Sequence, residues 1–125
     1  MASNRPFNFG PVALTTTLTT NIFNPGTTTG GVASTASPYD KLRAIIRHIR
    51  IVNKTGSAAS FSLWKGLTGA NTAGTEVVGI ALSVAANSAF DWYGIMVFDT
   101  VDFLVGGAGT TTALTIQGEG EIGVA

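Results

Sequence analysis

Residues 114–124, LTIQGEGEIGV, carry the clearest strand pattern in the chain. Apolar residues and polar or acidic residues alternate along this stretch. Successive side chains of a β-strand point to opposite faces, so the alternation predicts a strand with one buried face and one solvated face. The predicted buried face comprises Leu114, Ile116, Ile122 and Val124, and the outward face comprises Thr115, Gln117, Glu119 and Glu121.

Three more segments with period-two patterns precede this strand, at 78–84, 90–98 and 101–105, and Gly-rich or polar turns separate them. Segment 90–98 has apolar side chains at both even- and odd-numbered positions, and so on both faces of a strand. This predicts a strand in the centre of the fold. Several short strands joined by such turns predict an all-β fold, either a β-sandwich or a jelly-roll-like barrel.

Residues 39–53 fit two structures. Leu42, Ile45, Ile46 and Ile49 follow helical spacing, and Ser37-Pro38-Tyr39-Asp40 resembles the start of a helix. The segment is also rich in isoleucine, which packs better on a pleated sheet. A turn at 53–56 and a second apolar segment at 61–64 follow it. We therefore predict a β-hairpin, and a short helical turn at 39–42 preceding it stays open.

The first 37 residues differ from the rest. They are rich in Thr, Asn, Gly and Pro and contain scattered apolar residues. Within residues 12–22, apolar residues occur at alternate positions, which is compatible with a strand. A purely solvated tail does not need regularly placed apolar residues. We predict an extended N-terminal arm at 1–37 that becomes ordered on a neighbouring subunit, followed by a β-sandwich domain at 38–125. The arm's predicted interface residues are Phe7, Phe9, Leu14, Leu18 and Phe23.

Charge is scarce. Only 11% of the 125 residues are charged, and seven basic residues balance seven acidic ones. Ordinary soluble domains contain roughly 25% charged residues, and a neutral surface does little to prevent association. The composition favours a surface that partners cover, and a monomer solubilised by Thr, Ser and Asn is the alternative. Cysteine is absent, and neither a signal peptide nor an apolar run long enough to cross a bilayer occurs in the sequence.

The charges are also unevenly placed. Basic residues concentrate at 41–65 and acidic residues at 76–121. Cross-strand ion pairs within one subunit are the simpler interpretation. Head-to-tail complementarity between copies is the alternative.

Signals for catalysis and for metal or cofactor binding are weak. His48 is the single histidine, and the sequence contains no G-x-S-x-G nucleophile motif or P-loop. Asp91, Asp99 and Asp102 are too few for a calcium site of known spacing. Zero net charge argues against a nucleic-acid partner. We predict a protein that is not an enzyme and has no catalytic, cofactor-binding or metal-ligating residues.

Two aromatic residues are candidates for an exposed or interface position. Trp64 lies beside Lys65 in the sequence. Tyr93 is expected on the strand face opposite to that of Phe90 and Phe98. Tyrosine and tryptophan combine an apolar body with a polar group, which suits an interface or a sugar-stacking platform.

A set of short motifs carries a family resemblance over residues 43–125. The motifs are HIRIVNKT at 48–55, FSLW at 61–64, AANS at 85–88, DWYG at 91–94, DFLVG at 102–106 and GEGE at 118–121. In this order they resemble small β-sandwich virion proteins of tailed bacteriophages, which are often capsid decoration or auxiliary proteins. The resemblance implies no catalytic residues, and it does not cover the first 40 residues.

The resemblance implies a capsid decoration protein on the outer face of the virion, assembled in the host cytoplasm. The implied partners are the phage major capsid protein and further copies of the chain, with a trimer favoured, and neither nucleic acid nor membrane. A tail, neck or baseplate component is the first alternative. A carbohydrate- or receptor-binding module using Trp64 and Tyr93 is the second.

Overall fold

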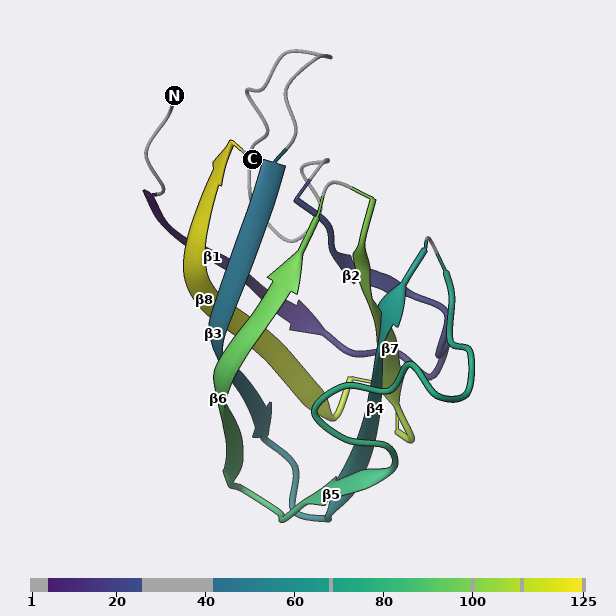
Figure 1. Cartoon of the computed structure of the whole chain (residues 1–125). Helices are drawn as coiled ribbons and strands as arrows, with labels where there is room; N and C mark the ends of the chain where they lie inside the picture. The colour runs from purple at the N-terminus through teal and green to yellow at the C-terminus, as the bar shows by residue number, and fades with distance from the viewer. Residues whose placement is uncertain (1–4, 26–41, 68, 100, 111, 125) are drawn as a thin grey trace.

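The computed structural model describes residues 5–25, 42–67, 69–99, 101–110 and 112–124. These residues form eight strands and no helix (Figure 1). The strands are β1 (Arg5–Ala13), β2 (Asn21–Phe23), β3 (Leu42–Asn53), β4 (Ala59–Gly66), β5 (Leu82–Val84), β6 (Ala89–Phe98), β7 (Phe103–Ala108) and β8 (Leu114–Val124).

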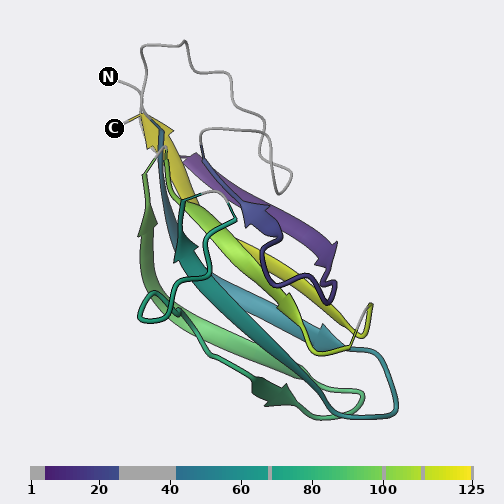
Figure 2. The same ribbon diagram turned by 90° about the vertical axis from the view of Figure 1, so that its right-hand side faces the viewer.

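The strands make two antiparallel sheets. Sheet A has the order β1-β8-β3-β6, and sheet B has the order β2-β7-β4-β5. Figure 2 gives the view turned by 90°. Apolar side chains from both sheets, including Phe9, Ile49, Phe61 and Leu104, form one buried core. The prediction of an all-β sandwich is confirmed.

Strand β8 has the predicted alternation. Leu114, Ile116 and Ile122 are buried, and Gln117 and Glu119 are exposed. This strand lies between β1 and β3, so its inward side chains sit in the middle of sheet A. The period-two pattern therefore identified this half-buried strand correctly.

A β-bulge explains the helical spacing in β3. The pairing of β3 with both neighbours shifts between Ile46 and His48. The extra residue switches the inward-facing side chains of β3 from even-numbered to odd-numbered positions. Ile46 and Ile49 are therefore both fully buried. Apolar residues three apart thus arise from a bulged strand. Residues 39–41 of the alternative helical turn lie outside the described part of the chain.

The predicted hairpin between residues 53 and 61 is wrong in its pairing. The two segments are strands as expected, but β3 belongs to sheet A and β4 to sheet B. The connection crosses between the layers, and the side chain of buried Asn53 organises it. Its amide nitrogen donates to the carbonyl oxygens of Ser57 and Val84, and its amide oxygen accepts from Thr55. The prediction of a turn at 53–56 was correct, but the turn residues alone did not specify which sheet contains the next strand.

The N-terminal residues are part of the sandwich, which corrects the prediction of an arm for residues 5–25. Strand β1 pairs with β8, and β2 pairs with β7. Residues 14–20 form a loop, so the alternative of one strand over 12–22 is also wrong. The few apolar residues here are large, and burying Phe9 and Phe23 outweighs the weak local β preference of the surrounding residues. The boundary predicted at residue 37 lies outside the described residues.

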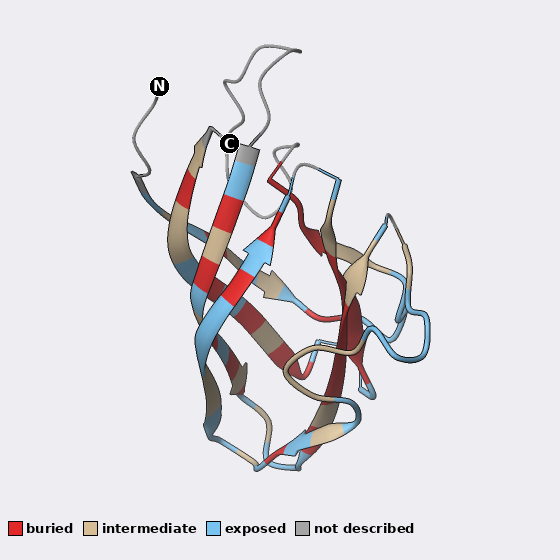
Figure 3. Ribbon diagram, viewed as in Figure 1, coloured by how far each residue is buried: buried red, intermediate tan, exposed pale blue. Residues whose placement is uncertain are grey.

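Strand β6 is one of the two edge strands of sheet A, so the prediction that it is central is wrong. Its inward residues Met96 and Phe98 are buried, while the outward Tyr93 and Ile95 are 71% and 69% exposed. Figure 3 shows the largely exposed colouring along this strand. Strand β6 therefore has apolar residues on both faces, although only one of its faces is buried within this chain.

The strand predicted at 78–84 is shorter than expected. Only Leu82–Val84 pairs with β4 as β5. Val78 and Ala81 have positive φ angles, and Ile80 between them is 60% exposed. Positive φ at residues with a side chain interrupts an extended strand. The sequence alternation therefore extends over residues 78–81, which do not form a regular strand.

Candidate functional site

The predicted interface residues separate into two groups. Four of them lie inside the chain's own core and have almost no side-chain surface for a partner. These are Phe9, Leu14, Phe23 and Trp64, at 1%, 2%, 0% and 6% exposure. The sequence identified apolar residues correctly but assigned them to the wrong contact, because they pack against strands that are distant in sequence.

The other three retain some surface. Phe7 is half-buried, and its ring stacks on Phe23 with the centroids 5.4 Å apart. Leu18 is 38% exposed in the loop between β1 and β2. Tyr93 is the most exposed of the predicted set. Because Trp64 is buried, it does not form a sugar-stacking platform with Tyr93.

The outward apolar side chains of β6 form a surface strip that we call the β6 patch. It consists of Tyr93, Ile95 and Val97. Val97 is paired with Ile45 of β3, which extends the apolar surface toward the middle of sheet A. Exposed apolar side chains at three alternate positions of one strand are typical of a surface that contacts another molecule.

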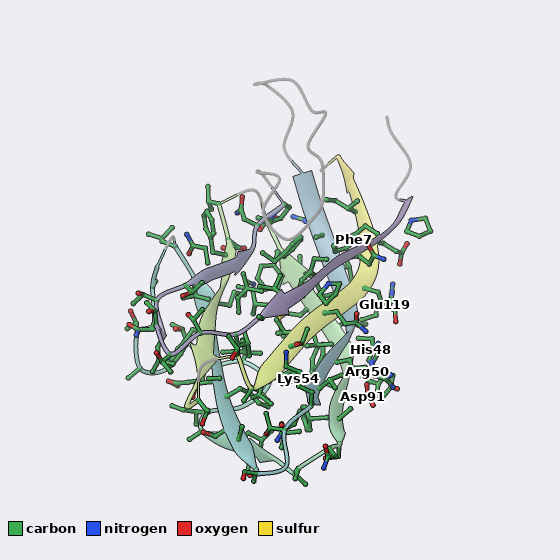
Figure 4. All side chains as sticks on the ribbon, turned by 180° about the vertical axis from the view of Figure 1, so that it is seen from behind. Phe7, His48, Arg50, Lys54, Asp91 and Glu119 are labelled. Carbon is green, nitrogen blue, oxygen red and sulfur yellow. The ribbon has the colours of Figure 1, made fainter. Side chains whose placement is uncertain are left out.

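A cluster of charged residues adjoins the β6 patch on the outer face of sheet A. We call it the His48 cluster, and it consists of His48, Arg50, Asp91 and Glu119 (Figure 4). The Nε2 atom of His48 lies 2.8 Å from Asp91 Oδ1, and its Nδ1 atom lies 2.9 Å from Glu119 Oε1. Arg50 Nε donates to the same oxygen of Asp91 over 2.8 Å. The cluster therefore links β3, β6 and β8.

The strand register creates this cluster. Arg50 is paired directly with Asp91, and the bulge after Ile46 places His48 opposite both Tyr93 and Glu119. The imidazole ring stacks on Tyr93 at 4.6 Å between centroids. The stack joins the His48 cluster to the β6 patch and holds the tyrosine ring against the sheet.

The cluster favours charged forms of its members. Hydrogen bonds to Asp91 and then to Glu119 raise the pKa of His48 above its ordinary value of 6.5. The hydrogen bonds from Arg50 and then from His48 lower the pKa of Asp91. Both ring nitrogens point at carboxylates, so the histidine is held as a proton-bearing bridge. This arrangement serves charge pairing, and neither nitrogen is left to act as a general base.

The remaining ion pairs also lie within the chain and join β3 or β4 to residues of β8 or of the connection between β6 and β7. Arg43 pairs with Asp99 at 2.9 Å, and Arg47 pairs with Glu121 at 2.7 Å. Lys65 lies 3.9 Å from Asp102. These contacts confirm the interpretation of the uneven charge distribution as cross-strand pairing.

The aspartates considered for calcium have other contacts. Asp91 belongs to the His48 cluster, and Asp99 accepts from Arg43. Asp102 accepts a hydrogen bond from the backbone amide of Asp99. Among the described residues, no group of three or more His, Asp or Glu side chains is arranged to hold a metal ion.

A shallow depression of about 180 Å³ lies beside His48. Its walls come from β1, including Gly10 and Pro11, and from His48 and Glu119. Both titratable side chains of this depression already have hydrogen-bond partners within the His48 cluster.

Within the described residues, no helix is long and apolar enough to cross a membrane.

Sequence reasoning missed the His48 cluster. The outward positions of Glu119 and Glu121 were predicted from alternation, but Asp91 and Glu119 are 43 and 71 residues from His48. The missing information was the register between β3 and its two neighbours.

Comparisons with known proteins add no family: no family model matches the chain, and no curated protein matches it significantly.

Proposed function

We propose that the chain is a structural virion protein of a tailed bacteriophage that decorates the outer face of the capsid. It binds the lattice of the major capsid protein, associates with further copies of itself and catalyses no reaction. The motif resemblance over residues 43–125 supports the kind of assembly. The observation that carries the proposal is that large apolar side chains are exposed on both layers of the sandwich.

In the first layer the exposed residues are those of the β6 patch on sheet A. In the second layer they lie in the loops beside sheet B. Leu67 directly follows β4, and Ile80 belongs to a segment that bonds to β4 through Val77 and Gly79. Their exposed fractions are 66% and 60%. A small domain with exposed apolar residues on two layers has two surfaces to cover, as a subunit of a lattice does.

The mechanism is stabilisation by mass action. A protein that binds only the assembled shell stabilises that shell by an amount that grows with its free concentration relative to Kd. Many equivalent sites on one particle add their contributions, and association between copies increases the effective concentration at neighbouring sites. Weak individual contacts then suffice for a stable coat.

The test compares the thermal stability of purified capsids with and without the protein. We expect saturable binding of the wild-type chain and a higher disruption temperature for the coated capsids. Absence of binding, or equal disruption temperatures at saturation, contradicts the proposal.

A variant pair sharpens this test. We expect the loops beside sheet B to face the lattice, so Leu67→Lys with Ile80→Lys weakens capsid binding. The matched control is Asn71→Lys with Ala73→Lys, which adds the same charge in the same loop region at exposed positions without removing a large apolar side chain. Equal binding by both double variants contradicts this orientation.

A tail, neck or baseplate component is the alternative within the same class. Copy number separates the two proposals. A decoration protein is present in hundreds of copies per virion, whereas a tail or neck protein is present in a few to some tens. Quantification of the chain in purified virions by mass spectrometry gives the answer.

A further inference from the structure

Each sheet of the sandwich ends in two edge strands, and these four edges differ in length and protection. The edges of sheet B are β2 and β5, with three residues each. The edges of sheet A are β1, with nine residues, and β6, with ten. Among the described strands, only β1 and β6 are therefore long enough to offer an extended pairing surface.

Strand β1 is protected against further pairing. Pro6 and Pro11 have no backbone N–H to donate, and the register with β8 shifts between Phe9 and Val12. Prolines and bulges are the features by which natural proteins prevent an edge strand from pairing with another chain.

Strand β6 differs from β1 in its residues: its register with β3 also shifts, between Tyr93 and Met96, but its ten residues form one uninterrupted strand. It contains no proline and no lysine, and its one charged residue, Asp91, is engaged by His48 and Arg50. Within the described part of the chain, β6 pairs only with β3. Its outward face carries the β6 patch. A long, apolar edge without proline or lysine is a template for strand addition.

We propose that β6 pairs with β6 of a second copy of this chain, antiparallel and centred on Ile95. This pairing joins two copies of sheet A into one continuous sheet. It extends the self-association in the proposed function, but it concerns the chain alone and is tested without capsids.

The sequence of β6 is self-complementary in this arrangement. An antiparallel pair related by a two-fold axis at Ile95 places Ile95 opposite itself and Tyr93 opposite Val97. These are pairs of aromatic and β-branched residues, which stabilise antiparallel strands. No charged residue occurs from Trp92 to Phe98, so the centre of the contact buries no charge.

The ends of the contact are electrostatically compatible. The same register places Asp91 of one copy opposite Asp99 of the other. Each carboxylate already has an arginine partner in its own chain, Arg50 for Asp91 and Arg43 for Asp99, at 2.8 and 2.9 Å. Two ion pairs therefore meet at each end, each already neutral within its own chain. Like charges left uncompensated would oppose the contact.

The stack of Tyr93 on His48 prepares the surface for binding. A ring already held against the sheet loses less conformational freedom when a partner covers it. The two-fold contact closes on two copies, because the residues described include no second long, unprotected edge to which β6 could pair head to tail. Edge pairing thus predicts a dimer in place of the trimer that the family resemblance implies.

The test measures the mass of the purified chain by analytical ultracentrifugation over a concentration series. We expect the wild-type chain to form a dimer. Ile95→Lys places two ammonium groups opposite each other and raises the dimer Kd by about a hundredfold or more. Ile80→Lys is the matched control, with the same substitution at 60% exposure outside sheet A, and we expect it to leave the dimer intact.

A charge-exchange experiment separates loss of contact from loss of folding. Ile95→Glu alone also prevents dimerisation, and an equimolar mixture of Ile95→Lys and Ile95→Glu chains restores a dimer, because opposite charges then meet at position 95. A wild-type monomer at all concentrations overturns the proposal. So does a trimer, an oligomer that persists in both Ile95 variants, or a mixture that stays monomeric.

Discussion

The two edges of sheet A show two ways in which one sheet can end. Strand β1 carries two prolines and a bulge, and it inserts Phe9 into the core. Strand β6 also has a register shift, between Tyr93 and Met96, but it lacks proline and lysine and exposes Tyr93 and Ile95 to solvent. The same sheet thus has one edge closed to pairing and one open to it. The difference indicates that the open edge is a contact surface, because edge protection is the ordinary condition of a soluble sheet.

The largest expected effect concerns the closed edge. Phe9→Ala removes a ring that is 1% exposed and stacks on Phe23 at 5.0 Å. We expect a loss of about 3–5 kcal/mol in the free energy of unfolding, measured by denaturant titration. Tyr93→Ala in β6 is the matched control, since it truncates an exposed aromatic, and we expect about 1 kcal/mol or less. Equal losses at the two positions would contradict the distinction between the edges.

Removal of residues 1–25 tests the same point on a larger scale. The deletion eliminates β1 and β2, together with Phe9 and Phe23. We expect the shortened chain to lose cooperative unfolding, because both sheets lose a strand and the core loses its stacked rings. A shortened chain with the β-sheet circular dichroism and the melting temperature of the whole protein would show that these residues are a dispensable arm after all.

A smaller effect is expected where β8 supports the closed edge. A Cβ atom added at Gly118 would lie inside contact distance of Phe9 Cε1. Gly118→Ala therefore forces the Phe9 ring to move, and we expect a loss of about 1–3 kcal/mol in stability. Gly56→Ala is the control, because nothing lies within 4 Å of its added Cβ. Thermal unfolding of the two variants gives the comparison, and an unchanged Gly118 variant would mean that Phe9 is loosely packed.

The smallest effect concerns pH at the open edge. The folded state raises the pKa of His48 above 6.5, so the stabilisation is fully present below that value and is lost as pH rises through the higher folded pKa. We expect the free energy of unfolding to decrease as pH rises above about 6.5, and to decrease less in His48→Gln.

The pH range avoids the opposing effect of Asp91. Its folded pKa lies below its ordinary value of 3.8, so its contribution is present above that value and is lost only as pH falls further. Denaturant titrations at several pH values measure both chains. Parallel pH profiles for wild type and variant would contradict the role assigned to His48.

Local patterns determined much of the fold. Alternation identified the inward face of β8, and the turn at Asn53 was correct because that side chain bonds to its own neighbourhood. The pairing of strands could not be obtained in the same way. The bulge in β3 imitates helical spacing, and the sheet to which β4 belongs depends on contacts made far along the chain.

The surface was harder to predict than the fold. Tyr93 was selected correctly as exposed, whereas Phe9 and Trp64 were assigned to an interface although the core buries them. Hydrophobicity alone does not distinguish burial inside a chain from burial between chains. The His48 cluster required the register of three strands, which no short motif encodes.

The most direct test of the open edge is hydrogen–deuterium exchange of the wild-type chain at low and high protein concentration. We predict that backbone amides of β6 become more protected as concentration rises, because the second copy supplies acceptors on its open side, while the amides of β1 remain unchanged. Exchange in β6 that does not depend on concentration, or protection that increases in β1 instead, would contradict the account.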